Sequence, residues 1–226
     1  MAGVMLQPRG SFIAINVNPP MPPTPLTAVL RLAFALLTLA AIGWQLWLHV
    51  GLGYSVLNFF SYFTNLSNLL AAGVLIAGAC RQWTHARSSA AFESLRAVTA
   101  TCMLVVGVVF ALLLRNVDLG DLRPWVNSVV HHAMPVVVVL DWLLWPPRPA
   151  VGVRPLRWVL GFAGPYLAYS MVRGAAVGWY PYPFLNPAKV GGYGGVAVYS
   201  LGIAVVVVIA GWALLAWASR RERVQT

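Results

Sequence analysis

Six long apolar segments run along this chain, separated by short polar connections. They cover residues 27–49, 57–80, 94–114, 125–146, 157–178 and 195–219. A helix needs about 20 apolar residues to cross the roughly 30 Å hydrocarbon core of a bilayer, so each segment is long enough to span one. The runs are continuous rather than alternating with a period of two, which argues against a membrane β-barrel. The pattern predicts an all-α polytopic membrane protein with six transmembrane helices.

The composition supports a membrane protein. Hydrophobic residues make up 60% of the 226 positions, and charged residues make up 9%. Soluble domains carry about 25% charged residues, so this chain has too few to cover a soluble surface. A net charge of +10 would suggest a nucleic-acid partner in a soluble protein. Arginines that flank apolar runs are instead typical topology signals, and we expect membrane lipids but no nucleic acid as partners.

The positions of arginine predict the orientation. Arginines gather after the second and fourth segments and at the C-terminus: Arg81, Arg87, Arg96, Arg148, Arg154, Arg157, Arg220, Arg221 and Arg223. In the connection after the third segment, Asp118 and Asp121 offset Arg115 and Arg123. The positive-inside rule then places both termini in the cytoplasm. The excess of arginine over lysine is typical of a GC-rich bacterial genome, which favours the cytoplasmic membrane of a bacterium.

The ends of the chain are interpreted as tails around one transmembrane domain of residues 27–219. Residues 1–26 are rich in proline and lack a cleavable signal pattern, so we expect a disordered tail. Residues 220–226 read as a basic C-terminal tail. Cys80 and Cys102 have no spacing typical of a disulfide or a metal site. No metal and no cofactor are expected.

Two polar sequences interrupt the apolar segments. The first is Ser61–Asn68 (SYFTNLSN) and the second is Asn127–His132 (NSVVHH). Unpaired polar groups are costly in hydrocarbon, so these side chains must pair or take part in chemistry. Counting along continuous helices places Thr64 and His131 about 10 Å below the outer boundary of the membrane and Arg173 about 8 Å below it. The shared depth indicates a common site.

Each polar residue also has a structural interpretation. Side chains at three- and four-residue intervals can hydrogen-bond neighbouring helices, and such a face is formed by Asn58, Ser61, Thr64, Asn65 and Asn68. Arg173 is equally compatible with an extension to lipid headgroups. Asp141 is expected to pair with Arg31 or Arg157, because an unpaired carboxylate in the membrane is costly.

Other sequence features predict local structure. Pro135 frees the carbonyl of His131, which is expected to widen a cavity or kink the helix. Aromatic residues are expected in a belt at the outer interface: Trp44, Trp47, Trp125, Trp179, Tyr180 and Tyr182. The run Trp179–Pro187 predicts either an interfacial anchor or a lid over the site.

Three sequences together resemble a family of bacterial six-helix membrane proteins that is similar to the animal androgen-induced and androgen-dependent integral membrane proteins. They are Phe60–Asn68, the run His131–Pro135 leading to Leu140-Asp141-Trp142, and Tyr180–Leu185. The resemblance extends from the first helix to the last. The animal proteins are threonine hydrolases that cleave fatty-acid esters of hydroxy fatty acids.

The resemblance implies that Thr64 is the catalytic threonine and that His131, which follows Trp125 and Asn127, is the catalytic histidine. The animal motif has a further histidine where this chain has Ser128, and His132 has no clear counterpart there. The implied function is an intramembrane lipid-ester hydrolase whose substrate is a fatty-acyl ester.

In the hypothesis that follows, Thr64 Oγ attacks the ester carbonyl while His131 takes its proton and later returns it to the leaving alcohol. Asn65 or Asn68 is expected to donate to the oxyanion. Arg173 is expected to hold a substrate carboxylate. Ser128 and His132 are further candidates at the site, and Asn127 or a loop aspartate is a candidate to orient His131.

Two other function classes stay open. A protein that binds haem or a quinone would use His131 or His132 together with His49, although no metal-ligand spacing supports this. A small transporter would line a path with the polar helix faces. We detect no repeat between the two halves of the chain, which argues against the transporter.

Overall fold

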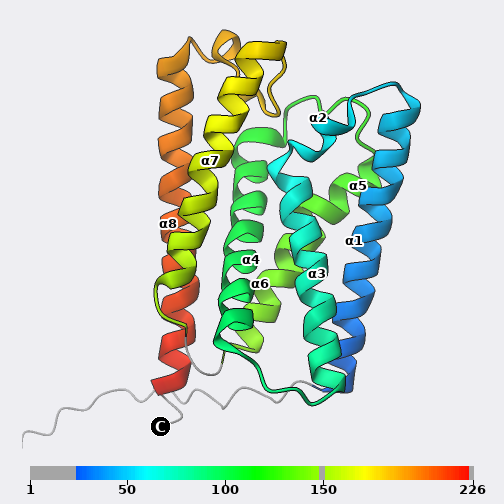
Figure 1. Cartoon of the computed structure of the whole chain (residues 1–226), viewed down its shortest axis with the longest axis vertical. Coiled ribbons are helices and arrows are strands. Elements are labelled where there is room, and N and C mark those ends of the chain that lie inside the picture. Colours follow the sequence, from blue (N-terminus) through cyan, green and yellow to red (C-terminus); the bar gives the residue numbers. More distant parts are fainter. Residues whose placement is uncertain (1–23, 148–150, 224–226) are drawn as a thin grey trace, which may run out of the picture.

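The computed structural model describes residues 24–147 and 151–223, and within these ranges the chain forms helices and no strands. The elements (Figure 1) are α1 (Pro25–Gly51), α2 (Val56–Phe60), α3 (Phe63–Trp83), α4 (Ala90–Val109), η1 (Phe110–Leu114), α5 (Pro124–Ser128), η2 (Val129–Ala133), α6 (Met134–Leu144), α7 (Arg154–Val177), η3 (Pro183–Leu185), η4 (Pro187–Lys189) and α8 (Tyr193–Arg223). The elements η1 and η2 are π-helical, and η3 and η4 are 3₁₀ turns.

The predicted tails meet the described chain at both ends. Residues 1–23 of the N-terminal tail and residues 224–226 of the C-terminal tail lie outside the described residues. At the N-terminus, α1 begins at Pro25, two residues before the predicted start. At the C-terminus, α8 continues to Arg223, so the first part of the predicted basic tail is helical.

Five helical stretches of the described chain are long and apolar enough to cross a membrane. They are Pro25–Gly51, Phe63–Trp83, Ala90–Leu114, Pro124–Leu144 and Tyr193–Arg221. The remaining predicted segment does form a helix, α7, with 24 residues. It is less apolar than the others because it carries Arg157, Arg173 and Pro165 along with several glycines and tyrosines. The part of the chain that the structure describes is thus all-helical, with five helices suited to spanning a membrane.

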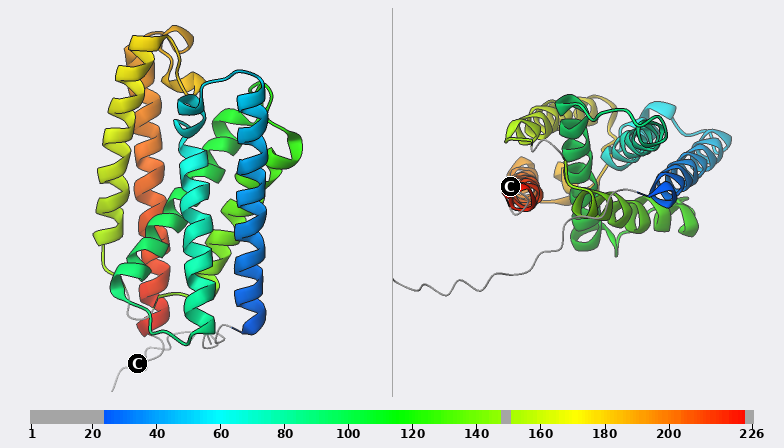
Figure 2. Two further views of the ribbon diagram at one scale, coloured as in Figure 1. Left: turned by 45° about the vertical axis from the view of Figure 1, so that its right-hand side comes forward. Right: turned by 90° about the horizontal axis from the view of Figure 1, so that it is seen from below.

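The long helices form a bundle in which α4 is central. It packs against α3, α6, α7 and α8, while α1 packs along α3. Figures 1 and 2 show α1 with α3 on one side of α4 and α6, and α7 with α8 on the other. Buried alanines such as Ala35, Ala71 and Ala97 lie in this core and permit close approach of the helices. The indole of Trp142 on α6 donates to the Leu214 carbonyl of α8 at 3.0 Å.

The second predicted helix is interrupted. The prediction of one helix over 57–80 is wrong at Ser61 and Tyr62, where α2 has ended and α3 has not yet begun. The physical reason is local hydrogen bonding, since a polar side chain takes a carbonyl that would continue α2. The Asn65 amide donates to the Phe59 carbonyl at 2.8 Å. Thr64 therefore lies in the first turn of α3.

The helix that carries His131 changes its form just before Pro135. Pro135 has no amide hydrogen, and the turn before it is the π-helix η2, which contains His131 and ends at Ala133. One residue more than usual is accommodated in such a turn, and these turns are frequent at functional sites. The irregularity beside Pro135 therefore takes the form of a π-helical turn.

The end of the bundle where α1 begins contains a buried ionic network. Asp141 on α6 accepts from Arg31 on α1 at 2.6 Å and from Arg96 on α4 at 2.9 Å. Arg96 also binds Glu93 at 2.8 Å. The predicted pairing of Asp141 with Arg31 is confirmed, and the second partner is Arg96 rather than Arg157.

Candidate functional site

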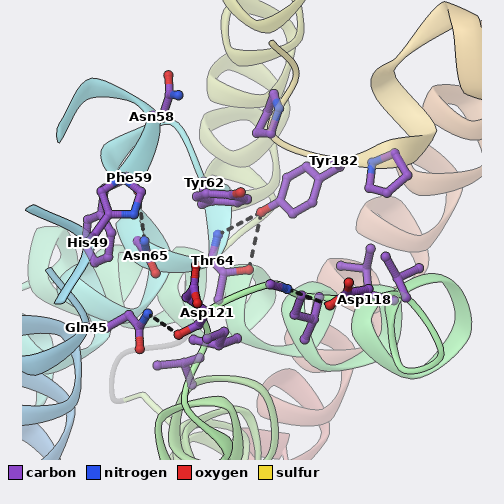
Figure 3. Close-up of a pocket in the computed structure, with 18 of the residues that line it drawn as sticks. Gln45, His49, Asn58, Phe59, Tyr62, Thr64, Asn65, Asp118, Asp121 and Tyr182 are labelled. Carbon is purple, nitrogen blue, oxygen red and sulfur yellow. Dashed lines mark hydrogen bonds between the residues drawn. The ribbon is translucent and has the colours of Figure 1, made fainter. Parts of the chain in front are cut away.

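A cavity of about 530 Å³ lies among α1, the α2–α3 break, η2 and two connecting loops. We call these the 115–123 loop and the 178–192 loop. Figure 3 is a close-up of the cavity, and Figure 1 places α2 and the 178–192 loop at the end of the bundle opposite the start of α1. Ligand cavities commonly measure about 300–1,000 Å³, so this one is of ordinary size for a small molecule or part of a lipid. Both Thr64 and His131 line it.

Thr64 is buried, and its hydroxyl and backbone amide both face one tyrosine. The Thr64 amide donates to the Tyr182 hydroxyl oxygen at 3.2 Å, and the two hydroxyl oxygens are 3.3 Å apart (Figure 3). Amides in the first turn of a helix have no partner within the helix. The break before α3 thus leaves a backbone N–H beside the Thr64 hydroxyl without a helical partner, and the Tyr182 hydroxyl oxygen accepts its hydrogen bond.

His131, which also lines the cavity, is held in one orientation. Its ring stacks on Phe110 of η1, with centroids 4.2 Å apart and planes at 20°. Its Nδ1 lies 2.7 Å from Oδ1 of Asn127, one turn earlier. An amide oxygen only accepts, so Nδ1 carries the hydrogen and Nε2 keeps a lone pair. This is the tautomer that a general base requires.

The two proposed partners are not in direct contact. Within the described chain no hydrogen bond joins Thr64 to His131. Asn68 fixes their elements relative to each other, because its amide donates to the Thr64 carbonyl at 2.9 Å and to the Val130 carbonyl at 3.1 Å. Asn68 is completely buried and does not line the cavity, so the expectation that it donates to an oxyanion is wrong in this structure. Asn65 lines the cavity, with its amide directed to the Phe59 carbonyl.

Three further candidates lie outside the lining of the cavity. Ser128 is exposed and donates to the Pro124 carbonyl at 3.0 Å. His132 is exposed and meets Phe110 edge to face. Arg173 donates to Oδ1 of Asn58 at 2.6 Å and lies over the Trp179 ring. Asn58 and Trp179 do line the cavity, so Arg173 lies behind its wall and is not placed to touch a substrate carboxylate directly.

The 115–123 loop closes one side of the cavity through contacts with α1 and with Tyr54, which follows α1. The Gln45 amide donates to the Asp121 carbonyl at 3.0 Å, and the Tyr54 hydroxyl donates to the Asp121 carboxylate at 2.8 Å. Asp118 accepts from the amide of Gly120 at 2.9 Å. Neither aspartate contacts His131, so the group that orients the histidine is Asn127 and not a loop aspartate.

Two residues at the site were not foreseen from the sequence. Tyr182 is predicted to lie near the outer interface, and the structure shows that its side chain is buried and bonded to Thr64. The sequence signal for this loop is the aromatic and proline-rich run Trp179–Pro187, one interpretation of which is a lid. Phe110 carried no signal, because its role depends on the packing of η1 against η2.

Comparison of the chain with protein-family models, curated proteins and solved structures finds no match. Within residues 24–147 and 151–223, no group of three or more His, Cys, Asp or Glu side chains is arranged to hold a metal ion. The functional interpretation therefore depends on the residues of this cavity and on the resemblance described above.

Proposed function

We propose that this protein is an intramembrane lipid-ester hydrolase in which Thr64 is the nucleophile and His131 is the general base. The observation that carries the proposal is that two groups line one cavity: a buried threonine hydroxyl and an imidazole whose Nδ1 is bonded to Asn127. A hydroxyl, a base and a group that orients the base are the parts that nucleophilic acyl transfer needs.

The reaction has two halves. Nε2 of His131 takes the Thr64 proton as Oγ attacks the ester carbonyl, and the protonated imidazole then gives that proton to the departing alcohol. Water hydrolyses the acyl-threonine by the same exchange in reverse. The missing contact between Thr64 and His131 is compatible with this scheme, because catalytic hydrogen bonds in sites without substrate are often long and tighten when substrate binds.

The proposed substrate is a fatty-acyl ester, with fatty-acid esters of hydroxy fatty acids as the class that the family resemblance implies. The cavity supports an apolar ester, since Ile42, Leu114, Val126 and Val130 form part of its wall. Arg173 does not line the cavity but donates a hydrogen bond to Asn58, which does. A substrate carboxylate would therefore meet the Asn58 amide before the guanidinium.

We place the protein in the cytoplasmic membrane of a bacterium with six spans and both termini in the cytoplasm. The sixth span is α7, whose 24 residues extend about 36 Å, enough to cross hydrocarbon. Its N-terminal arginines lie at the same end as those of the connection before α4 and the end of α8, in keeping with the positive-inside rule. The cavity then belongs to the outer half of the membrane.

The test is to compare fluorophosphonate labelling and lipid-ester hydrolysis in the wild type, Thr64→Ala and His131→Ala. We expect both variants to lose activity by about 10³-fold or more, the scale of removing a nucleophile or base. Ser67→Ala is the matched control, because Ser67 is also buried on α3 but does not line the cavity. Wild-type labelling and hydrolysis in Thr64→Ala would overturn the proposal.

A further inference from the structure

The hydroxyl of Tyr182 lies within hydrogen-bonding distance of the proposed nucleophile, Thr64 Oγ. Its oxygen accepts from the Thr64 amide, so the phenol hydrogen is free to point to Thr64 Oγ, 3.3 Å away. In the resting site either hydroxyl can donate to the other. Once Thr64 has lost its proton, its oxygen only accepts, and Tyr182 must then be the donor.

Packing in the 178–192 loop fixes the position of Tyr182. Its ring stacks on Phe184, with centroids 5.0 Å apart and planes at 8°, and meets the Tyr62 ring edge to face at 5.6 Å. The loop also lies tightly on α7 at Gly174, where an added Cβ would come within 2.1 Å of the Tyr180 ring. The hydroxyl is therefore held in place before substrate arrives, which is the condition for electrostatic stabilisation of a transition state.

We propose that Tyr182 is a third catalytic residue, which donates a hydrogen bond to Thr64 Oγ as this oxygen loses its proton to His131. The inference rests on the proposed role of Thr64. The bond that forms is between Oγ and the ester carbon, the bond that breaks is between this carbon and the alcohol oxygen, and the only proton transferred is the one carried by His131. Tyr182 keeps its own proton throughout.

Two properties of Tyr182 suit this role. Burial raises its pKa to about 12, so the phenol stays protonated and able to donate at neutral and mildly alkaline pH. The ionisable side chains that face it are the phenols of Tyr62 and Tyr166, and phenols are neutral at pH 7. The present distance of 3.3 Å is long for two neutral hydroxyls. Hydrogen bonds to an anionic oxygen are about 2.5–2.7 Å long, so the contact strengthens as charge develops on Oγ.

The experiment compares Tyr182→Phe with Tyr166→Phe in the full-length protein, purified in detergent and assayed with a fatty-acyl ester. Tyr166→Phe is the matched control, because its hydroxyl binds the Ser61 carbonyl at 2.8 Å and does not reach Thr64. For Tyr182→Phe we expect kcat and the fluorophosphonate labelling rate to fall about 10- to 100-fold, with KM changed less than about threefold. The control is expected to stay within about threefold of the wild type in all three quantities.

Wild-type kcat and labelling in Tyr182→Phe, with Thr64→Ala and His131→Ala inactive, would overturn the role of Tyr182 alone. An active Thr64→Ala would instead overturn the proposed function itself. Equal losses in Tyr182→Phe and Tyr166→Phe would show that both hydroxyls act only through folding, which also overturns the inference.

A second measurement keeps the inference testable if the phenylalanine variant does not fold. Difluorotyrosine at position 182 retains the ring and hydroxyl but makes the phenol more acidic. We expect kcat of this protein to decline with rising pH as the fluorinated phenol loses its proton, in a range where the wild type is unaffected. Identical pH profiles for the two proteins would contradict a donor role.

Discussion

The two ends of the helix bundle both contain buried polar groups, but the groups differ in charge and in how they are paired. At the end where α1 begins, the carboxylates of Asp141 and Glu93 are bonded to arginines at 2.6–2.9 Å. At the other end, a threonine hydroxyl and an imidazole, those of Thr64 and His131, line one cavity of about 530 Å³. One end has opposite charges paired in contact, and the other has neutral groups next to open space.

This difference indicates which end contributes mainly to the stability of the fold and which end is available for chemistry. A full charge buried in the bundle needs a partner of opposite charge in direct contact, and removing one partner leaves the other charge uncompensated. Neutral hydroxyls and imidazoles cost less to bury, so they can be left with unused hydrogen-bonding capacity. Substitutions at the ionic network are therefore expected to change stability first, and substitutions around the cavity are expected to change activity first.

The largest expected effect is on stability and comes from Asp141→Ala. It removes the shared partner of Arg31 and Arg96 and should destabilise the protein by about 3–5 kcal/mol, the usual cost of breaking a buried ion pair from one side. Thermal unfolding in detergent measures this. Asp118→Ala removes the same charge from an exposed loop position and should change stability by less than about 0.5 kcal/mol. Equal effects of the two substitutions would break the distinction between the two ends.

The next effect is on catalysis and comes from Asn127→Ala. Without the 2.7 Å contact to Nδ1, His131 is free to take the wrong tautomer, and the lost hydrogen bond to a catalytic group is worth about 1.5–3 kcal/mol, or roughly 10- to 100-fold in kcat. Asn127→Asp keeps an acceptor at the same place and should retain most of the activity. If both variants equal the wild type, Asn127 does not orient His131.

A smaller effect is expected from Gly174→Ala, which tests the 178–192 loop. The added methyl would meet the Tyr180 ring, so this ring, which belongs to the loop carrying Tyr182, must move, and we expect a cost of about 1–3 kcal/mol shared between stability and activity. Gly164→Ala on the same helix has no atom within 4 Å of the new Cβ and should leave activity unchanged. A wild-type rate of ester hydrolysis in Gly174→Ala would show that the loop position is not critical.

The sequence predicts the helices better than the site because helices depend on local pattern. Apolar run length located all six long helical segments, and the pairing of Asp141 with Arg31 followed from the cost of a lone carboxylate. The break at Ser61–Tyr62 was missed because the same residues also fit a continuous polar stripe. The contact of Tyr182 with Thr64 joins positions 118 residues apart and depends on how the loop folds back over α3, which no local pattern specifies.

The smallest effect distinguishes two adjacent histidines that the sequence could not separate. His131 is buried against Phe110 and lines the cavity, whereas His132 is exposed and outside it. His132→Ala should therefore keep kcat within about twofold of the wild type. Its free energy of unfolding should stay within about 0.5 kcal/mol of the wild type, as for most exposed positions. His131→Ala, measured in the same ester assay, should lose about 10³-fold. An equal loss of activity in His132→Ala would mean that lining the cavity does not identify the catalytic base. It would contradict the assignment of this role to His131.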